Sequence, residues 1–143
     1  MQAGKLDAAE RLFEQAIQLQ PRHIGALNVF SILLTRLGRY GEAEHYVRRA
    51  LQEDATSDVT FYNYGVILKA LRRPAEALEQ FDKALKINAS VAETWNNRGT
   101  VLNDLKRYRE AIADFDRATA TNPNYADAFY NKGNALAELK QYG

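Results

Sequence analysis

Residues 61–85 read FYNYGVILKALRRPAEALEQFDKAL, and this stretch decides the fold. It returns at 95–119 as WNNRGTVLNDLKRYREAIADFDRAT, and its first half returns at 129–143 as FYNKGNALAELKQYG. The three starts are evenly spaced, and one further step back reaches LNVFSILLTRLGRYGEAEHYVRRAL at 27–51. A fixed period of about 34 residues is the signature of stacked repeat architectures. The sequence therefore predicts half-repeats at 1–23 and 126–143 that flank three full repeats, 24–57, 58–91 and 92–125.

Apolar residues within each repeat fall at helical spacing. Leu68 and Leu71 are three residues apart, and Phe81, Ala84 and Leu85 continue the three-and-four spacing in the second half of the repeat. That spacing places them on one face of an α-helix, whereas a strand would require strict alternation. Each repeat is therefore predicted to form two helices, and no segment is predicted to form a strand.

Short polar segments are predicted to separate these helices. The turns LGRY at 37–40 and LKRY at 105–108 divide the two helices of a repeat. Pro21 and Pro123 separate consecutive repeats, because proline cannot continue a helix. Ser90-Val91-Ala92-Glu93 has the spacing of a capping box, so the hydroxyl of Ser90 is expected to cap the following helix.

Certain residue types recur at equivalent positions of the repeats. A large residue early in the first helix is Leu27, Phe61, Trp95 and Phe129. A small residue four positions later is Ser31, Gly65, Gly99 and Gly133. The second helix carries alanines at Ala43, Ala77 and Ala111 and an aromatic at Phe13, Phe81 and Phe115. A small residue allows two helices to approach closely, and an aromatic fills the gap beside it.

This pattern resembles the tetratricopeptide repeat over essentially the whole chain. The resemblance implies an all-α, right-handed superhelical solenoid of antiparallel helix hairpins. Single repeats depart from the family pattern at Pro74, Val47, Ala55 and Ala89. These four departures leave the period intact.

The composition excludes several classes of protein. Of 143 residues, 46% are hydrophobic and 26% charged, and the formal net charge is only +1, so neither a nucleic-acid nor a membrane partner is expected. The absence of cysteine excludes disulfides and thiolate metal sites. No apolar run reaches the roughly 20 residues of a membrane-spanning helix. A cytoplasmic location is therefore expected.

The residues that could bind a metal or act as acid–base catalysts lack the neighbouring residues that such sites require. His23 and His45 have no third ligand at metal spacing. Acidic pairs are found at Glu42/Glu44, Glu76/Glu79 and Asp114/Asp116. They are interpreted as helix-start carboxylates that pair with Arg or Lys four residues on, and not as acid–base couples. We therefore expect no metal, no cofactor and no enzymatic activity.

The resemblance implies that the first helices line a concave groove that binds segments of partner proteins. Asn63, Asn97 and Asn131 form an asparagine row along this wall, and it resembles the asparagine ladder of protein O-linked N-acetylglucosamine transferases. Their amides are expected to bind the backbone of an extended peptide. Alternatively, they bond to neighbouring turns. The other groove candidates are Tyr62, Asn96, Tyr130, Lys69, Thr100 and Asn134.

The groove is expected to change character along its length. Ile32, Arg36 and Lys69 make its front apolar to basic, while Asp104 and Glu138 make its back acidic. This favours a mixed ligand with a basic portion near the C-terminal end. The lysine of the family's carboxylate clamp is missing, because its position holds Asn28, Tyr62, Asn96 and Tyr130. A chaperone-tail adaptor is therefore not expected.

The two half-repeats predict exposed faces at the ends of the array. The chain is expected to begin within a turn and to be a fragment of a longer array, for example the substrate-recruiting portion of a glycosyltransferase. Alternatively, the helix at Leu6–Leu19 docks on the last helix of another copy in a self-assembling, head-to-tail scaffold. The residues expected at that joint are Leu6, Phe13, Phe129, Leu136 and Leu139.

Overall fold

The computed structural model describes the backbone of residues 2–142 and the side chains of residues 3–141. Within these residues the chain forms eight α-helices and no strand, which confirms the predicted all-α helical repeat fold. The helices are α1 (Gln2–Leu19), α2 (Ile24–Arg36), α3 (Tyr40–Glu53), α4 (Asp58–Ala70), α5 (Pro74–Ile87), α6 (Ala92–Asp104), α7 (Tyr108–Thr121) and α8 (Ala126–Tyr142).

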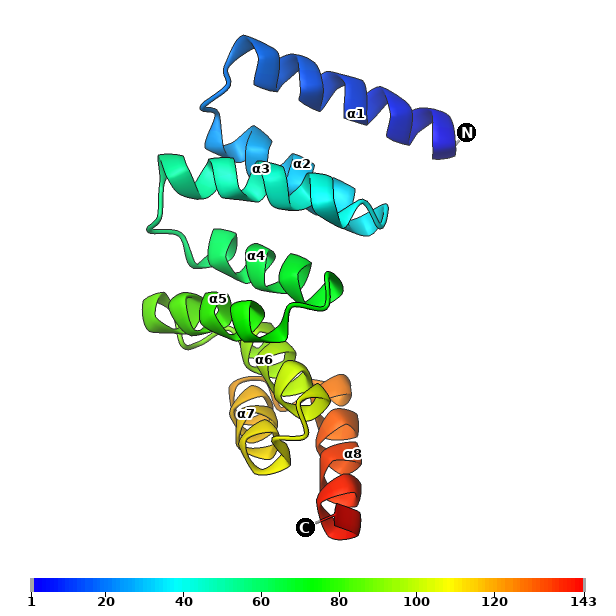
Figure 1. The fold of residues 1–143 in the computed structure, drawn as a ribbon, viewed down its shortest axis with the longest axis vertical. Helices are drawn as coiled ribbons and strands as arrows, with labels where there is room; N and C mark the ends of the chain where they lie inside the picture. Colours follow the sequence, from blue (N-terminus) through cyan, green and yellow to red (C-terminus); the bar gives the residue numbers. More distant parts are fainter. Residues whose placement is uncertain (1, 143) are drawn as a thin grey trace.

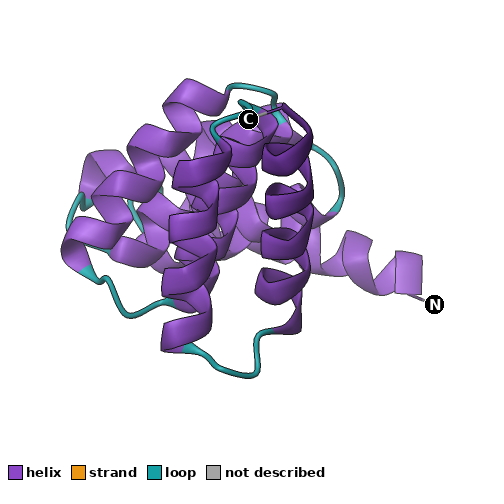
Figure 2. Ribbon diagram, turned by 90° about the horizontal axis from the view of Figure 1, so that it is seen from below, coloured by secondary structure: helices purple, strands orange, loops and turns teal. Residues whose placement is uncertain are grey.

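The helices stack in sequence order, so that α1 and α8 lie at opposite ends of an elongated molecule (Figure 1). Helices α2 and α3, α4 and α5, and α6 and α7 form antiparallel hairpins, while α1 projects from its end of the stack (Figure 2). Each first helix of a repeat also approaches the next first helix, from α2 through α4 and α6 to α8. Among the described residues the second helices α3, α5 and α7 do not approach one another. The stack is therefore narrower along its first helices, which line its inner face.

A glycine and a phenylalanine hold the second and third hairpins together. A Cβ atom at Gly65 would lie 2.5 Å from the ring of Phe81, and one at Gly99 would lie 2.6 Å from the ring of Phe115. Both rings are fully buried. In the first hairpin Ser31 and Val47 occupy the positions equivalent to the glycine and the phenylalanine. The larger residue on the first helix is thus accompanied by a smaller one on the second.

The predicted turns at 37–40 and 105–108 are confirmed, and 71–74 forms a third turn of the same kind. In each turn one residue has a left-handed backbone, with φ of 75° at Gly38 and 61° at both Arg72 and Lys106. The following amide bonds five residues back, as in Arg39 N to Leu34 O at 2.9 Å. This is the Schellman ending, which satisfies the last carbonyls of the helix.

Two local predictions are wrong. Ser90 does not cap α6: its hydroxyl donates to Asn88 Oδ1 at 2.8 Å, and the N-cap residue is Val91, without a side-chain bond. The Asn88 side chain closes a local turn and thereby takes the hydroxyl. The chain also does not begin within a turn, because α1 is helical from Gln2.

Candidate functional site

The inner face holds a pocket of about 580 Å³ that spans three consecutive repeats. Thr35 comes from α2, Val66 and Lys69 come from α4, and Asp104 comes from the end of α6. Tyr40, Ala70 and Arg72 complete the wall. The pocket thus contains Lys69, which was predicted to line the groove, and Asp104, which was predicted to make its far part acidic.

Lys69 is a half-buried cation in this pocket. Its Nζ lies 3.4 Å from Asn97 Oδ1, and none of the ion pairs in the described part of the chain includes it. Burial lowers the pKa of Lys69, and the charge of Asp104 opposes that shift. An ammonium group that has lost water without gaining a carboxylate partner is well placed to accept an anionic group.

The asparagine row takes part in hydrogen bonds between successive repeats. Asn97 Nδ2 donates to Tyr62 Oη at 3.0 Å, and Asn131 Nδ2 donates to Asn96 Oδ1 at 3.0 Å. Each bond joins residues 35 positions apart, one on each of two successive first helices. Asn97 Nδ2 also bonds to Glu93 O at 3.0 Å. These amide nitrogens therefore hold α4 to α6 and α6 to α8.

Asn63, the remaining member of the asparagine row, has the same spacing from the preceding first helix as Asn97 and Asn131 have. Its counterpart there is Asn28, and both Asn63 Nδ2 and Asn28 Oδ1 are buried without a partner among the described residues. Asn28 Nδ2 bonds to Thr60 Oγ1 at 3.0 Å, which already joins α2 to α4. The structure records no donor for the side-chain oxygens of Asn63 and Asn131 within the described part. Peptide anchoring by the row stays a prediction, and these two oxygens are the atoms open to it.

The remaining groove candidates differ in exposure. Asn96 is buried and donates to Tyr125 Oη at 3.3 Å, and Thr100 donates to Asn97 O at 2.7 Å. Tyr130 is 70% exposed, and Asn134 is exposed as well. Tyr130 and Asn134 are therefore accessible on α8, whereas Asn96 has a role inside the packing.

The residues predicted for self-association lie at the two ends of the stack and do not meet within one molecule (Figure 1). Leu6 on α1 is 39% exposed, and on α8 Phe129 is 53% and Leu136 46% exposed. Phe13 and Leu139 are half-buried. Each end thus presents apolar surface.

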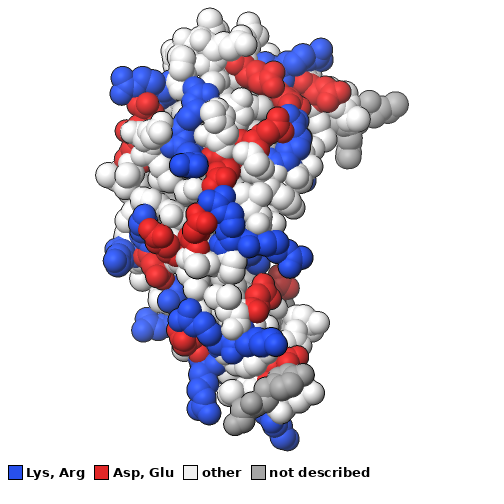
Figure 3. Space-filling model, in the orientation of Figure 1, with Lys and Arg blue, Asp and Glu red and all other residues white. Residues whose placement is uncertain are grey.

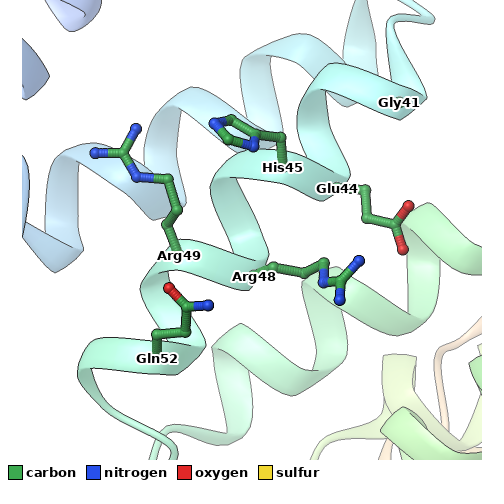
Figure 4. A pocket seen from close by; sticks show the side chains of 6 residues that line it. All are labelled: Gly41, Glu44, His45, Arg48, Arg49 and Gln52. Carbon is green, nitrogen blue, oxygen red and sulfur yellow. The ribbon is translucent and has the colours of Figure 1, made fainter.

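A second pocket, of about 430 Å³, lies along α3 alone and is lined by Gly41, Glu44, His45, Arg48, Arg49 and Gln52 (Figure 4). Two of its charged groups already have partners. Glu44 accepts two bonds from Arg73, at 2.8 and 2.9 Å, and Arg49 donates to Pro21 O at 2.9 Å. Glu44 thereby joins α3 to the turn before α5, and Arg49 joins α3 to the turn before α2.

Neither histidine belongs to a metal site in the described residues. His23 caps α2, since its Nδ1 accepts from Ala26 N at 3.0 Å, and His45 is exposed on α3. No group of three His, Cys, Asp or Glu side chains that could hold a metal ion is found in the part of the chain that the structure describes. In the same part no helix is long and apolar enough to cross a membrane.

The carboxylates near the helix starts pair differently from the prediction. Among those described, only Glu79 bonds four residues on, to Lys83 at 3.3 Å. Three others pair backwards with an arginine at the N-cap, in the pairs Arg39–Glu42, Arg73–Glu76 and Arg107–Glu110. These arginines lower the pKa values of their glutamates. The R-x-x-E spacing, which recurs once in each full repeat, is the signal that could have revealed them.

Two of these arginines also reach the preceding repeat, where Arg39 bonds to Glu10 and Arg73 to Glu44. The face seen in Figure 3 accordingly shows cations and anions interleaved, without a large region of one sign.

A partly buried ionic cluster joins the second and third repeats. Arg98 bonds to Asp82 at 2.7 Å and to Asp114 at 2.9 Å. Burial raises the pKa of Asp114 to about 6, although the neighbouring Arg98 acts in the opposite direction. The sequence interpretation of Asp114 as a helix-start carboxylate missed this role, because its partner lies on another helix.

Comparison with known proteins agrees with this architecture. Sequence profiles of the tetratricopeptide repeat match residues 1–59, 60–91, 92–125 and 115–143. Tetratricopeptide repeat protein 7B of Homo sapiens is 35% identical over 54 residues, which is 38% of this chain and 6% of that protein. The chain thus spans a small part of that relative.

Solved structures show the same fold. MamA superposes with a TM-score of 0.88 at 18% identity, covering 97% of this chain and 76% of that one. YrrB, described as a tetratricopeptide repeat protein with an unusual peptide-binding site, has a TM-score of 0.80 at 26% identity and covers 99% of this chain and 73% of that one. The period, the fold and these matches agree: the chain belongs to the tetratricopeptide repeat family.

Proposed function

We propose that this chain is a protein-interaction scaffold that binds an extended segment of a partner protein along the inner face of α2, α4, α6 and α8. The observation that carries the proposal is the pocket across three repeats with the half-buried Lys69 in its wall. The peptide-binding site attributed to YrrB supports a binding role for a related array.

The chemistry of the wall favours a segment with an acidic side chain at Lys69. A carboxylate there would replace the water that the ammonium has lost, and Arg72 lies in the same wall. Val66 offers an apolar contact beside it. Farther along the array, Asp104 favours a basic residue in the segment.

In this proposal the asparagine row does not offer three free amide groups to the peptide. The amide nitrogens of Asn97 and Asn131 join neighbouring helices, so replacing them with alanine would disturb the stack as well as the groove. The oxygens of Asn63 and Asn131 would accept from backbone N–H groups of the segment. Binding of this kind also suits the alternative in which the groove recruits substrate for a larger enzyme.

The test is selection of binders from a library of displayed random peptides, followed by affinity measurement with variants. Lys69→Glu and Val66→Arg change the pocket, and Arg48→Glu on α3 is the matched charge reversal on the second pocket. Enriched peptides should carry Asp or Glu. Their dissociation constant should rise by about 10- to 100-fold with Lys69→Glu, the loss of one charge-assisted bond. It should not change with Arg48→Glu.

Circular dichroism must show the same helix content in all variants. Peptides that bind equally well to Lys69→Glu and Val66→Arg but lose affinity with Arg48→Glu would place binding on α3 and refute the proposal. The same conclusion follows if no peptide is enriched.

A further inference from the structure

The turn between α4 and α5 contains a residue in a backbone conformation that suits glycine. Arg72 has a φ of 61°, and the equivalent residue of the first repeat is Gly38, with a φ of 75°. A left-handed backbone is unfavourable for a residue that has a Cβ atom. The geometry of the turn therefore does not account for an arginine at this position.

Lys106 in the third repeat provides an internal comparison, because it occupies the same position with the same φ of 61°. A cation there interacts favourably with the C-terminal end of the preceding helix, and this benefit is common to both residues. The two residues differ in their surroundings: Arg72 lines the pocket of about 580 Å³ on the inner face, whereas Lys106 does not. What is particular to Arg72 is therefore its place in that pocket.

Three charged side chains line this pocket, and none of them belongs to an ion pair in the described part of the chain. Lys69 comes from the last turn of α4, Arg72 from the turn that follows, and Asp104 from the end of α6. The charge of Asp104 acts on Lys69, since it opposes the lowering of the Lys69 pKa by burial. Two positive charges and one negative charge make the pocket complementary to one negative charge and not to two.

We propose that Lys69 and Arg72 together bind one carboxylate of the partner segment, and that Asp104 makes the pocket reject a phosphate group. Such recognition rests on the proposed function, the binding of a segment along the inner face, and it identifies the side chain at this point as Asp or Glu. The guanidinium of Arg72 presents paired N–H donors that match the two oxygens of a carboxylate, while the ammonium of Lys69 acts as a point charge. A phosphate monoester carries a charge of about −2 near neutral pH, and Asp104 would repel the second charge.

The test uses the tightest-binding peptide from the displayed library, synthesised in three versions. The first keeps the acidic residue that contributes most to affinity, the second has the corresponding amide, Asn or Gln, and the third has phosphoserine there. Calorimetry measures the dissociation constants. With Arg72→Gly the constant of the acidic version should rise about 10-fold, the effect of losing one charge-assisted bond, while that of the amide version should change by less than about twofold.

Lys106→Gly is the matched control, because it removes a cation from the same position of a turn outside the pocket. It should leave all three dissociation constants unchanged. The two glycine variants should also shift the melting temperature by similar amounts, since both place glycine at a left-handed position. A loss of affinity in Arg72→Gly alone thus reports on the pocket and not on the turn.

Asp104→Asn tests the rejection of phosphate. The wild-type chain should bind the phosphoserine version at least about fivefold more weakly than the acidic version, and Asp104→Asn should bind the phosphoserine version about 10-fold more tightly than wild type does. Asp7→Asn removes an exposed carboxylate on α1, outside this pocket, and is the control of equal charge. It should change neither constant.

The role of Arg72 is overturned if Arg72→Gly changes the constants of the acidic and amide versions by the same factor. The role of Asp104 is overturned if the wild-type chain prefers the phosphoserine version. In both cases the proposed function remains supported as long as Lys69→Glu weakens binding. If no peptide is enriched, the carboxylate pocket and the proposed function fail together.

Discussion

The first and third repeats differ at the seventh residue of their first helices, where α2 has Phe30 and α6 has Arg98. Phe30 is 1% exposed, with the ring of Phe13 at 5.9 Å and that of Tyr46 at 4.7 Å. Arg98 occupies the equivalent place and bonds to carboxylates on both neighbouring second helices. The same position between three helices can thus be filled by an apolar ring or by an ion-paired side chain. The requirements are that its volume is filled and that any charge is paired.

The second repeat and the final half-repeat have other residues at the same position. Tyr64 in α4 buries its ring and donates its hydroxyl to Glu44 at 2.9 Å, and Lys132 in α8 pairs with Asp116 at 2.5 Å. The larger hydrophobic cluster extends from α1 through α5 and includes Val101 of α6. A smaller cluster around Leu102 and Phe115 lies in α6, α7 and α8. The junctions become more polar from α1 to α8.

The largest effect should come from the apolar end. Phe30→Ala should lower the free energy of unfolding by about 4 kcal/mol, because it removes a buried ring and leaves a cavity. Urea denaturation followed by circular dichroism measures it. Phe129→Ala, at 53% exposure, is the control and should cost well under about 1 kcal/mol. Similar losses of unfolding free energy from both variants would contradict the assignment of Phe30 to the core and of Phe129 to the exposed end of the stack.

The ionic junction should be nearly as sensitive when its pairing is broken. Arg98→Met should cost about 3 kcal/mol near neutral pH, because the buried carboxylate of Asp114 loses its partner. The double variant Arg98→Met/Asp114→Leu should recover most of the loss, since an apolar pair can fill the same space. If the double variant is less stable than Arg98→Met alone, an apolar pair cannot replace the ion pair at this position.

The ionic junction should also respond to pH. The pKa of Asp114 is raised in the folded state to about 6, from an unfolded value of about 3.9, so between these values the folded chain binds a proton that the unfolded chain does not. This group therefore favours folding as pH falls through 6 and opposes it as pH rises. Asp114→Asn removes the effect.

The measurement is the difference in unfolding free energy between Asp114→Asn and wild type. The difference should be about 2 kcal/mol more favourable to the variant near pH 7 than near pH 4. Taking a difference cancels Glu42 and Glu76, whose lowered pKa values act in the opposite direction. A flat difference would show that Arg98 fully offsets the burial of the carboxylate.

The smallest effect should come from the junction between α4 and α6. Tyr62→Phe keeps the ring and removes the oxygen that accepts from Asn97 Nδ2, so it should cost about 1 kcal/mol. Asn97 Nδ2 retains its bond to Glu93 O, which limits the loss. Thermal unfolding measures the change. A loss as large as that of Phe30→Ala would mean that this bond governs the stacking of the two repeats.

The sequence was sufficient for features that the repeat period controls. The hairpins, their turns and the facing Gly65 and Phe81 follow from the period and the space between packed helices. Partners that lie on another repeat could not be predicted, because the rotation between repeats decides which side chains meet. Asn97 therefore has Tyr62 as a neighbour, and Arg98 has Asp82 and Asp114.

Competition between neighbouring polar groups for the same partner also limited the prediction. Ser90 has the right spacing for a capping box, but the side chain of Asn88 is closer to its hydroxyl. In the same way, Glu76 pairs with Arg73 at the preceding N-cap and not with a residue farther along its own helix. Spacing along one helix predicts a face, whereas the choice of partner depends on which group is nearest.

The contacts of this stack reach only the next one or two helices, and α1 approaches α2 alone among the described helices. Opening can therefore start at one end without disturbing the other, as in a one-dimensional chain of coupled units. Amide hydrogens in α1 should exchange with solvent much faster than those in α4, which has neighbours on both sides.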